Sequence, residues 1–137
     1  KWSLVFTGTK ADNDLIKYIG GDNFINLAGQ TTIKDLIEIF SRATLVMAPD
    51  SGSAHVARAT EIPAVISIFC CTPPTSYGPF GDDKKYFAIN GKLKCQPCHT
   101  RKCPLKGEDA EQCVNYPRPE EIINIVNNVL QNSQHSV

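Results

Sequence analysis

Apolar and polar residues alternate in blocks along the 137-residue chain, and each block predicts a strand or a helix. Short apolar runs bounded by glycine, proline or polar residues predict strands at 3–6, 24–27, 45–48, 64–69 and 85–89. Apolar residues three and four positions apart predict helices at 12–18, at 33–43, from 56 onward and at 119–130. Strands that alternate with helices through short connections are typical of βαβ units. We therefore predict an α/β fold with a parallel sheet flanked by helices.

Two of these helices have apolar stripes that we expect to face the core. The apolar residues of the first are Ile33, Leu36, Ile37, Phe40 and Ala43. Those of the last helix are Ile122, Ile123, Val126, Val129 and Leu130. Thr32 and Asp35 have the spacing of a capping box, and Pro119 suits a first helical turn. Residues 70–84 and 91–117 have no such periodicity and are predicted to be loops.

The segment from Asp50 to His55 joins a predicted strand to the helix that follows it. Its small residues Ser51, Gly52 and Ser53 allow N–H groups at the helix start to converge on one spot, which suits a phosphate or another anion. Asp50 and His55 add a carboxylate and an imidazole at the two ends. In parallel sheets, ligands bind at the carboxyl ends of the strands, where this turn is placed. We predict an anion-binding site here.

The composition excludes some classes of function. Fourteen basic and fourteen acidic residues cancel, so we expect no nucleic-acid partner. A hydrophobic content of 42% and a charged content of 20% are ordinary for a globular domain, and no apolar run approaches the ~20 residues that span a bilayer. The length suits a single domain, residues 1–137. Because the chain starts inside a predicted strand, we expect it to be a piece of a longer protein.

Four stretches, taken together and in this order, resemble the C-terminal domain of glycosyltransferase family 9, the heptosyltransferases of bacterial lipopolysaccharide synthesis. They are Asn26–Ile33, Asp50–Ala57, Ile62–Val65, and Thr72–Pro74 with Tyr77–Pro79. The Asp-Ser-Gly-x-x-His element that begins at Asp50 is the most specific, and the resemblance covers nearly the whole chain. One departure is that Cys70 and Cys71 stand where the family usually has Gly-Pro.

The resemblance implies the GT-B architecture, in which two Rossmann-like domains face each other across a cleft. This chain would be the C-terminal half, whose Rossmann-like parallel sheet binds the sugar nucleotide, typically ADP-heptose. The implied reaction is an inverting transfer of heptose to a lipopolysaccharide core or similar acceptor, without a cofactor. The acceptor domain and the catalytic base would lie outside this chain, so residues 1–137 alone would be inactive. The implied location is cytoplasmic, at the inner face of the bacterial inner membrane, with peripheral membrane contact.

The resemblance also implies roles for particular residues. Ser51 and Gly52 would contact the diphosphate through backbone amides and the Ser51 hydroxyl. Asp50 and His55 would meet the sugar hydroxyls or the phosphates. The remaining donor-binding residues would be Thr31 beside the adenosine, Asp12 at the ribose, and Thr72 in the loop after the 64–69 strand.

A purely structural role is the alternative for each of these residues. Asp50 or Ser51 suits the N-cap of a helix, and Thr31 suits the cap of the 33–43 helix. Asp12 suits a first helical turn, where a carboxylate complements the helix dipole. For the protein as a whole, the corresponding alternative is a non-catalytic module that binds a nucleotide or a protein partner.

Four of the six cysteines lie within nineteen positions of the 91–117 loop: Cys95, Cys98, Cys103 and Cys113. Such a set favours a tetrahedral zinc site, with His99 as a substitute ligand, or an iron site. Reduced thiols, or disulfides formed on handling, are the alternative, because the later spacings do not match a standard zinc ribbon. A metal- or thiol-binding protein is thus a further alternative function. Cys70 and Cys71 are predicted to be buried, small apolar side chains.

Overall fold

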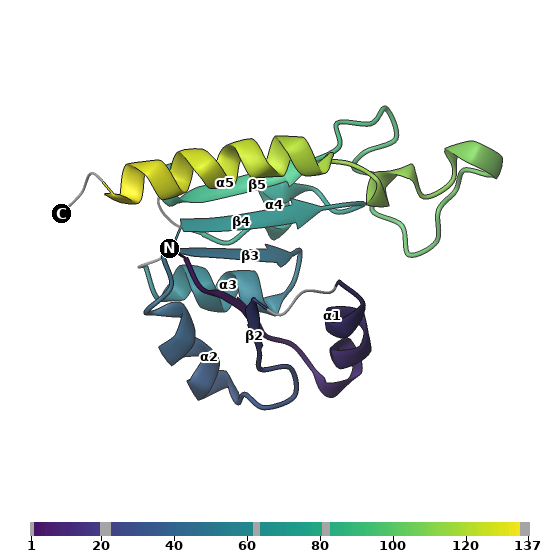
Figure 1. Ribbon diagram of the computed structural model, residues 1–137. Helices are drawn as coiled ribbons and strands as arrows, with labels where there is room; N and C mark the ends of the chain where they lie inside the picture. Colours follow the sequence, from purple (N-terminus) through teal and green to yellow (C-terminus); the bar gives the residue numbers. More distant parts are fainter. Residues whose placement is uncertain (1, 20–22, 62–63, 81–82, 135–137) are drawn as a thin grey trace. The chain divides into compact units, whose positions relative to one another are not determined.

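The computed structural model describes residues 2–19, 23–61, 64–80 and 83–134 (Figure 1). The chain forms two compact units, one ending at Ile39 and the other beginning at Phe40. Each unit contains parallel strands and helices, which confirms the α/β class predicted from the alternating pattern. That the whole chain is a single donor-binding domain stays a prediction. Among the described residues, no helix has both the length and the apolar character needed to cross a membrane.

The first unit is built around two short parallel strands. Its elements are β1 (Leu4–Phe6), a 3₁₀ turn (Lys10–Asp12), α1 (Asn13–Ile19), β2 (Phe24–Asn26) and α2 (Ile33–Phe40). β1 and β2 pair in parallel, and the rings of Phe6 and Phe24 meet edge to face with centroids 5.1 Å apart. The 3₁₀ turn and α1 connect the two strands, so this part of the chain is the βαβ unit that the periodicity predicts.

The connection from β2 to α2 lies against the loop after β1. The N–H of Gly29 donates to the carbonyl of Gly8 at 2.8 Å. Gly29 has φ of +72°, and a Cβ there would overlap Cγ of Lys10 and lie 3.0 Å from its Cα. Only glycine fits this conformation and this space. Close backbone packing therefore fixes the segment that leads to Thr31.

The second unit contains a three-stranded parallel sheet with β4 in the centre, between β3 and β5. Its elements are β3 (Leu45–Pro49), α3 (Gly52–Ala59), β4 (Ala64–Phe69), α4 (Pro74–Tyr77), β5 (Tyr86–Asn90) and α5 (Pro119–Gln134), with 3₁₀ turns at Asp83–Lys85, Gly107–Asp109 and Gln112–Val114. Figure 1 shows the three arrows pointing the same way and the 91–117 loop extending beyond their carboxyl ends.

β4 forms the centre of the core of this unit. Val65, Ile66 and Phe69 are completely buried, as expected for a parallel strand covered on both faces. α3 packs against β3 and β4, and its buried residues include Ala54 and Ala57. Their small side chains let the helix lie close to the sheet. This close packing fixes the start of α3 relative to the ends of β3 and β4.

The observed elements follow the predicted ones with few differences. The 64–69 strand matches β4 residue for residue, whereas the 33–43 helix ends at Phe40. α4 lies inside the predicted 70–84 loop, and α5 continues beyond 130 to Gln134. Pro74 at the start of α4 is the same signal as Pro119 at the start of α5. Residues 62 and 63, part of the third matching stretch, lie outside the described residues.

Part of each predicted apolar stripe is exposed, so these core predictions were wrong. Ile123 is 53% exposed although Ile122 is half-buried, and Ile37 is 46% exposed although Leu36 is half-buried. Neighbouring residues in a helix are rotated by about 100° from each other, so only one of each pair lies on the covered side. Phe40 is buried as predicted.

Candidate functional site

Asp50 and Thr72 lie at the carboxyl ends of neighbouring strands. Asp50 follows β3, and its N–H donates to the carbonyl of Ile68 in β4 at 3.0 Å. Thr72 follows β4, and its hydroxyl donates a hydrogen bond to Oδ2 of the Asp50 carboxylate. Both residues are half-buried. The fold thus joins two of the predicted site residues, 22 positions apart in sequence, in direct contact.

The turn between β3 and α3 presents the first amide groups of the helix. Ser51 is the N-cap, with an extended backbone (φ −158°, ψ 167°), so Asp50 is not the cap. Among the residues that the structure describes, the Ser51 side chain makes no capping hydrogen bond to the helix. Its hydroxyl instead shares a hydrogen bond with that of Ser53 at 2.7 Å. The first N–H groups of a helix have no partner within the helix, so this turn is suited to an anion.

Gly52 and His55 are both exposed in the first turn of α3. A Cβ added to Gly52 would meet no heavy atom within 4 Å in the described parts of the chain. Packing therefore does not require a glycine here. This open space leaves room for an anion beside the amide groups at the start of the helix.

Asp12 and Thr31 belong to the first unit. The Asp12 carboxylate accepts hydrogen bonds from the Thr9 hydroxyl at 2.8 Å and the Thr9 N–H at 2.6 Å, and these bonds lower the pKa of Asp12. It therefore has the local capping role of the structural alternative. Thr31 is half-buried next to Thr32, which forms the predicted capping box with Asp35. The ribose and adenosine contacts of Asp12 and Thr31 stay predictions.

A group of polar side chains in the interior was missed by the sequence analysis. Ser67 in β4 is completely buried, and Arg58 in α3 is 6% exposed. The pKa of the nearby Tyr86 hydroxyl is raised, mainly because the group is partly buried. Ser67 and Arg58 oppose this rise, and the charge of Asp50 adds to it. Within the described residues, the Ser67 and Tyr86 hydroxyls have no partner at hydrogen-bond geometry. The one sequence signal was a serine inside an otherwise apolar strand.

The four cysteines of the 91–117 loop do not belong to any group of potential metal ligands in the described parts of the chain. Among the described residues, no three His, Cys, Asp or Glu side chains lie close enough together to hold a metal ion. The Cys98 sulfur is hydrogen-bonded to the Thr100 hydroxyl at 3.3 Å, and the Cys103 sulfur accepts the N–H of Glu111 at 3.3 Å. The hypothesis of structural zinc or iron is therefore not supported.

Cys113 lies beside Cys70 instead. Each thiol affects the titration of the other, and burial is the main reason that the pKa of both is raised. In contrast, the Thr100 hydroxyl lowers the pKa of Cys98. Cys70 and Cys71 are half-buried, so the prediction that they are buried was wrong. Their position after the last residue of β4, where the chain leaves the sheet, explains the difference.

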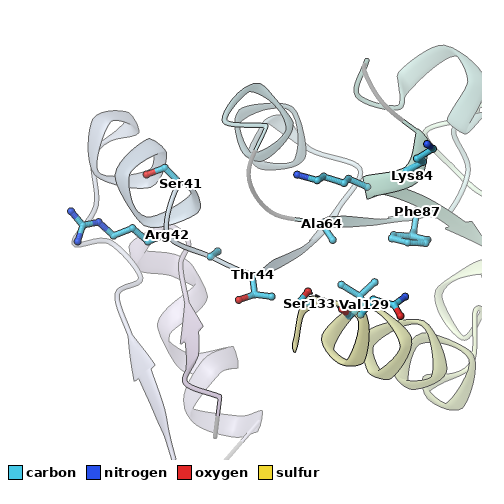
Figure 2. A pocket seen from close by; sticks show the side chains of 11 residues that line it. Ser41, Arg42, Thr44, Ala64, Lys84, Phe87, Val129 and Ser133 are labelled. Carbon is cyan, nitrogen blue, oxygen red and sulfur yellow. Dashed lines mark hydrogen bonds between the residues drawn. The ribbon is translucent and has the colours of Figure 1, made fainter. Parts of the chain in front are cut away.

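A pocket of about 520 Å³ lies at the opposite end of the sheet in the second unit. Figure 2 shows its walls, which include Thr44 before β3, Ala64 at the start of β4, Phe87 near the start of β5 and Ser133 near the end of α5. Thr44, Ala64 and Phe87 mark the amino ends of the three strands. Ligands of parallel α/β sheets bind at the carboxyl ends, so we place the candidate site at Asp50 and not in this pocket.

Comparison with known sequences agrees with the resemblance. The sequence pattern of glycosyltransferase family 9 (heptosyltransferase) matches residues 1–108. Lipooligosaccharide heptosyltransferase 2 of Campylobacter jejuni is 29% identical over 136 residues, which are 95% of this chain and 41% of that protein. A lipopolysaccharide core heptosyltransferase of Haemophilus influenzae is 37% identical over 57 residues, 42% of this chain and 16% of that protein. The chain thus spans about two fifths of the length of the Campylobacter relative.

Two solved structures share the fold. The ADP-heptose lipopolysaccharide heptosyltransferase II of Escherichia coli has a TM-score of 0.72 and 19% identity, covering 97% of this chain and 38% of that chain. A family 9 glycosyltransferase of Veillonella parvula has a TM-score of 0.74 and 17% identity, covering 96% and 37%. These likenesses confirm the predicted Rossmann-like fold, and the sequence match extends over most of the chain. The chain belongs to glycosyltransferase family 9, the heptosyltransferase family.

Proposed function

We propose that this chain is the donor-binding part of an inverting glycosyltransferase that transfers heptose from ADP-heptose to a lipopolysaccharide core or similar acceptor. Membership of family 9 supports the reaction, and the names of the Campylobacter and Haemophilus relatives support the acceptor. The name of the Escherichia coli structure supports the donor. The observation that carries the proposal is the Asp50–Thr72 hydrogen bond beside the first turn of α3.

The first turn of α3 would bind the diphosphate. In an inverting transfer the acceptor hydroxyl attacks the anomeric carbon, the bond to the diphosphate oxygen breaks, and negative charge grows on that oxygen. The N–H groups at the start of α3 and the Ser51 hydroxyl suit that charge, and open space beside Gly52 allows close approach. Such donors stabilise the transition state more than the ground state. Loss of one comparable donor costs about 3–4 kcal/mol.

Asp50 would orient the sugar. The Thr72 hydroxyl is bonded to Oδ2 of its carboxylate, so Oδ1 would be the atom that accepts from a sugar hydroxyl. His55, exposed one turn along α3, would contact a further hydroxyl or a phosphate. Fixing the sugar in this way places the anomeric carbon for attack. The acceptor and the catalytic base would come from outside residues 1–137, in a cytoplasmic protein at the inner face of the bacterial membrane.

Replacement of Asp50 by asparagine in the full-length protein tests the site. Asp50→Asn keeps an oxygen that accepts from Thr72 but removes the charge, so we expect folding to be retained. Donor binding should weaken roughly 10- to 100-fold, the range for a lost hydrogen bond to a charged group. Calorimetric titration with the donor and the melting temperature are the two measurements. Unchanged donor affinity in the folded variant would contradict the assignment.

The donor itself is tested with a panel of ADP- and UDP-sugars, titrated into the full-length protein. We expect ADP-heptose to bind most tightly. Tighter binding of a UDP-sugar would replace the proposed donor but keep the site, because the diphosphate contacts are shared. Binding of nucleotides without any transfer to a lipopolysaccharide acceptor would favour a non-catalytic module.

A further inference from the structure

Gln96 connects the loop after β5 to the segment that follows β4. Its side-chain Nε2 donates to the carbonyl of Cys70 at 2.6 Å. Its Oε1 accepts the N–H of Leu93 at 2.9 Å, and its own N–H donates to the Leu93 carbonyl at 2.9 Å. One side chain therefore closes a turn in the loop and also holds the first residue after β4.

His99 makes two further contacts with the same segment. Its backbone N–H donates to the carbonyl of Cys71 at 2.8 Å. Its ring Nε2 and the hydroxyl of Tyr77, the last residue of α4, are hydrogen-bonded at 2.7 Å, with ring centroids 5.2 Å apart. His99 has φ of +53°, a conformation that only a few percent of non-glycine residues adopt. Such a conformation persists where the surrounding contacts over-determine it.

These contacts hold the segment from Cys70 to Tyr77 on both sides of Thr72. Each bonded carbonyl fixes a planar peptide unit, and the unit that contains the Cys71 carbonyl also contains the N–H of Thr72. The direction of the Thr72 backbone is therefore set by the loop. Its side chain in turn donates to Asp50. The contacts form a continuous connection from the loop, through Thr72, to the candidate site.

We infer that Gln96 and His99 are positioning residues for the sugar-nucleotide donor, because they fix Thr72 and through it the Asp50 carboxylate. The inference rests on the proposed function of this site. It gives the 91–117 loop a role that needs no metal. Cys70 and Cys71 follow β4, at the place where the sequence departs from the usual Gly-Pro of the family. Hydrogen bonds from Gln96 and His99 to their carbonyls hold the backbone there.

Three variants of the full-length protein test this inference. Gln96→Glu keeps the acceptor for Leu93 but places a carboxylate oxygen against the Cys70 carbonyl. His99→Ala removes the bond to Tyr77, whereas His99→Gln offers a side-chain nitrogen at a similar reach. Thr100→Ala is the matched control, because Thr100 lies in the same loop and its hydroxyl is hydrogen-bonded to the sulfur of Cys98, which belongs to that loop as well.

We expect Gln96→Glu and His99→Ala to raise the donor Kd and the donor KM about tenfold, the effect of one lost hydrogen bond, and to leave the acceptor KM unchanged. His99→Gln should restore the donor affinity to within about twofold of wild type. Thr100→Ala should match wild type. Tyr77→Phe removes the same bond from its other end, so we expect the same tenfold loss of donor affinity from it. This variant replaces His99→Ala if His99→Ala is too unstable to assay.

The outcomes separate this inference from the proposed function. If wild type binds the donor and Asp50→Asn does not, but Gln96→Glu and His99→Ala bind as wild type, the positioning role is wrong and the proposed function stands. Equal losses in His99→Ala and His99→Gln, or an equal rise in the acceptor KM, would also overturn the positioning role. If wild type binds no sugar nucleotide, the proposed function fails and the inference fails with it.

Discussion

Gly29 and Gly52 both lie in stretches that resemble the family, but their surroundings differ. Gly29 has a left-handed backbone and is packed against Lys10, whereas Gly52 has open space where a Cβ would lie. Glycine at 29 is therefore a requirement of folding. Packing does not explain the glycine at 52, and the proposed function predicts that a ligand approaches the backbone there.

Alanine substitutions at the two glycines separate these needs. Gly29→Ala should lower the free energy of unfolding by at least about 1–2 kcal/mol, because of the left-handed conformation alone. Gly52→Ala should leave the unfolding free energy within about 0.5 kcal/mol of wild type but weaken donor binding about tenfold. Denaturant unfolding and calorimetric titration measure the two effects. Normal donor binding by Gly52→Ala would argue against close approach of the diphosphate.

Among the secondary-structure elements, α2 shows what local sequence predicts well. The capping box at its start is confirmed: the Thr32 N–H and hydroxyl each donate to the Asp35 carboxylate at 2.7 Å, and the Asp35 N–H donates to the Thr32 hydroxyl at 3.3 Å. Only neighbouring residues take part, so sequence alone is sufficient. The burial of Ile37 depends on what covers the helix, and there the prediction was wrong.

The cap predicts a pH dependence of stability. The Thr32 N–H and then its hydroxyl lower the pKa of Asp35 below its ordinary value of 3.8. A group with a lower pKa in the folded state binds its proton less readily there, so acid favours unfolding. Wild type should therefore be more stable than Asp35→Asn at neutral pH, and the difference should shrink as the pH falls below 3.8. Thermal unfolding at several pH values measures this, and a pH-independent difference would contradict it.

In the molecule as a whole, the parallel sheet of the second unit gives the two ends of its strands different roles. The carboxyl ends carry Asp50 and Thr72, and the amino ends form the pocket lined by Thr44 and Ala64. We expect Thr44→Val, which removes a hydroxyl from that pocket, to leave donor affinity within about twofold of wild type. Calorimetric titration of the full-length variant beside Asp50→Asn is the measurement. A large loss in Thr44→Val would move the donor site to the pocket.

The sequence by itself determined the elements and the family. Both follow from local patterns: the strand and helix periods, the proline at the start of α5 and the Asp-Ser-Gly-x-x-His element. Local patterns can be recognised without knowledge of the tertiary contacts. The tertiary structure alone decided which distant residues meet. It bonded Thr72 to Asp50 and Gln96 to Cys70, and it placed Cys113 near Cys70. Those pairings depend on where the sheet brings strand ends and an irregular loop together, and no spacing in the sequence encodes that.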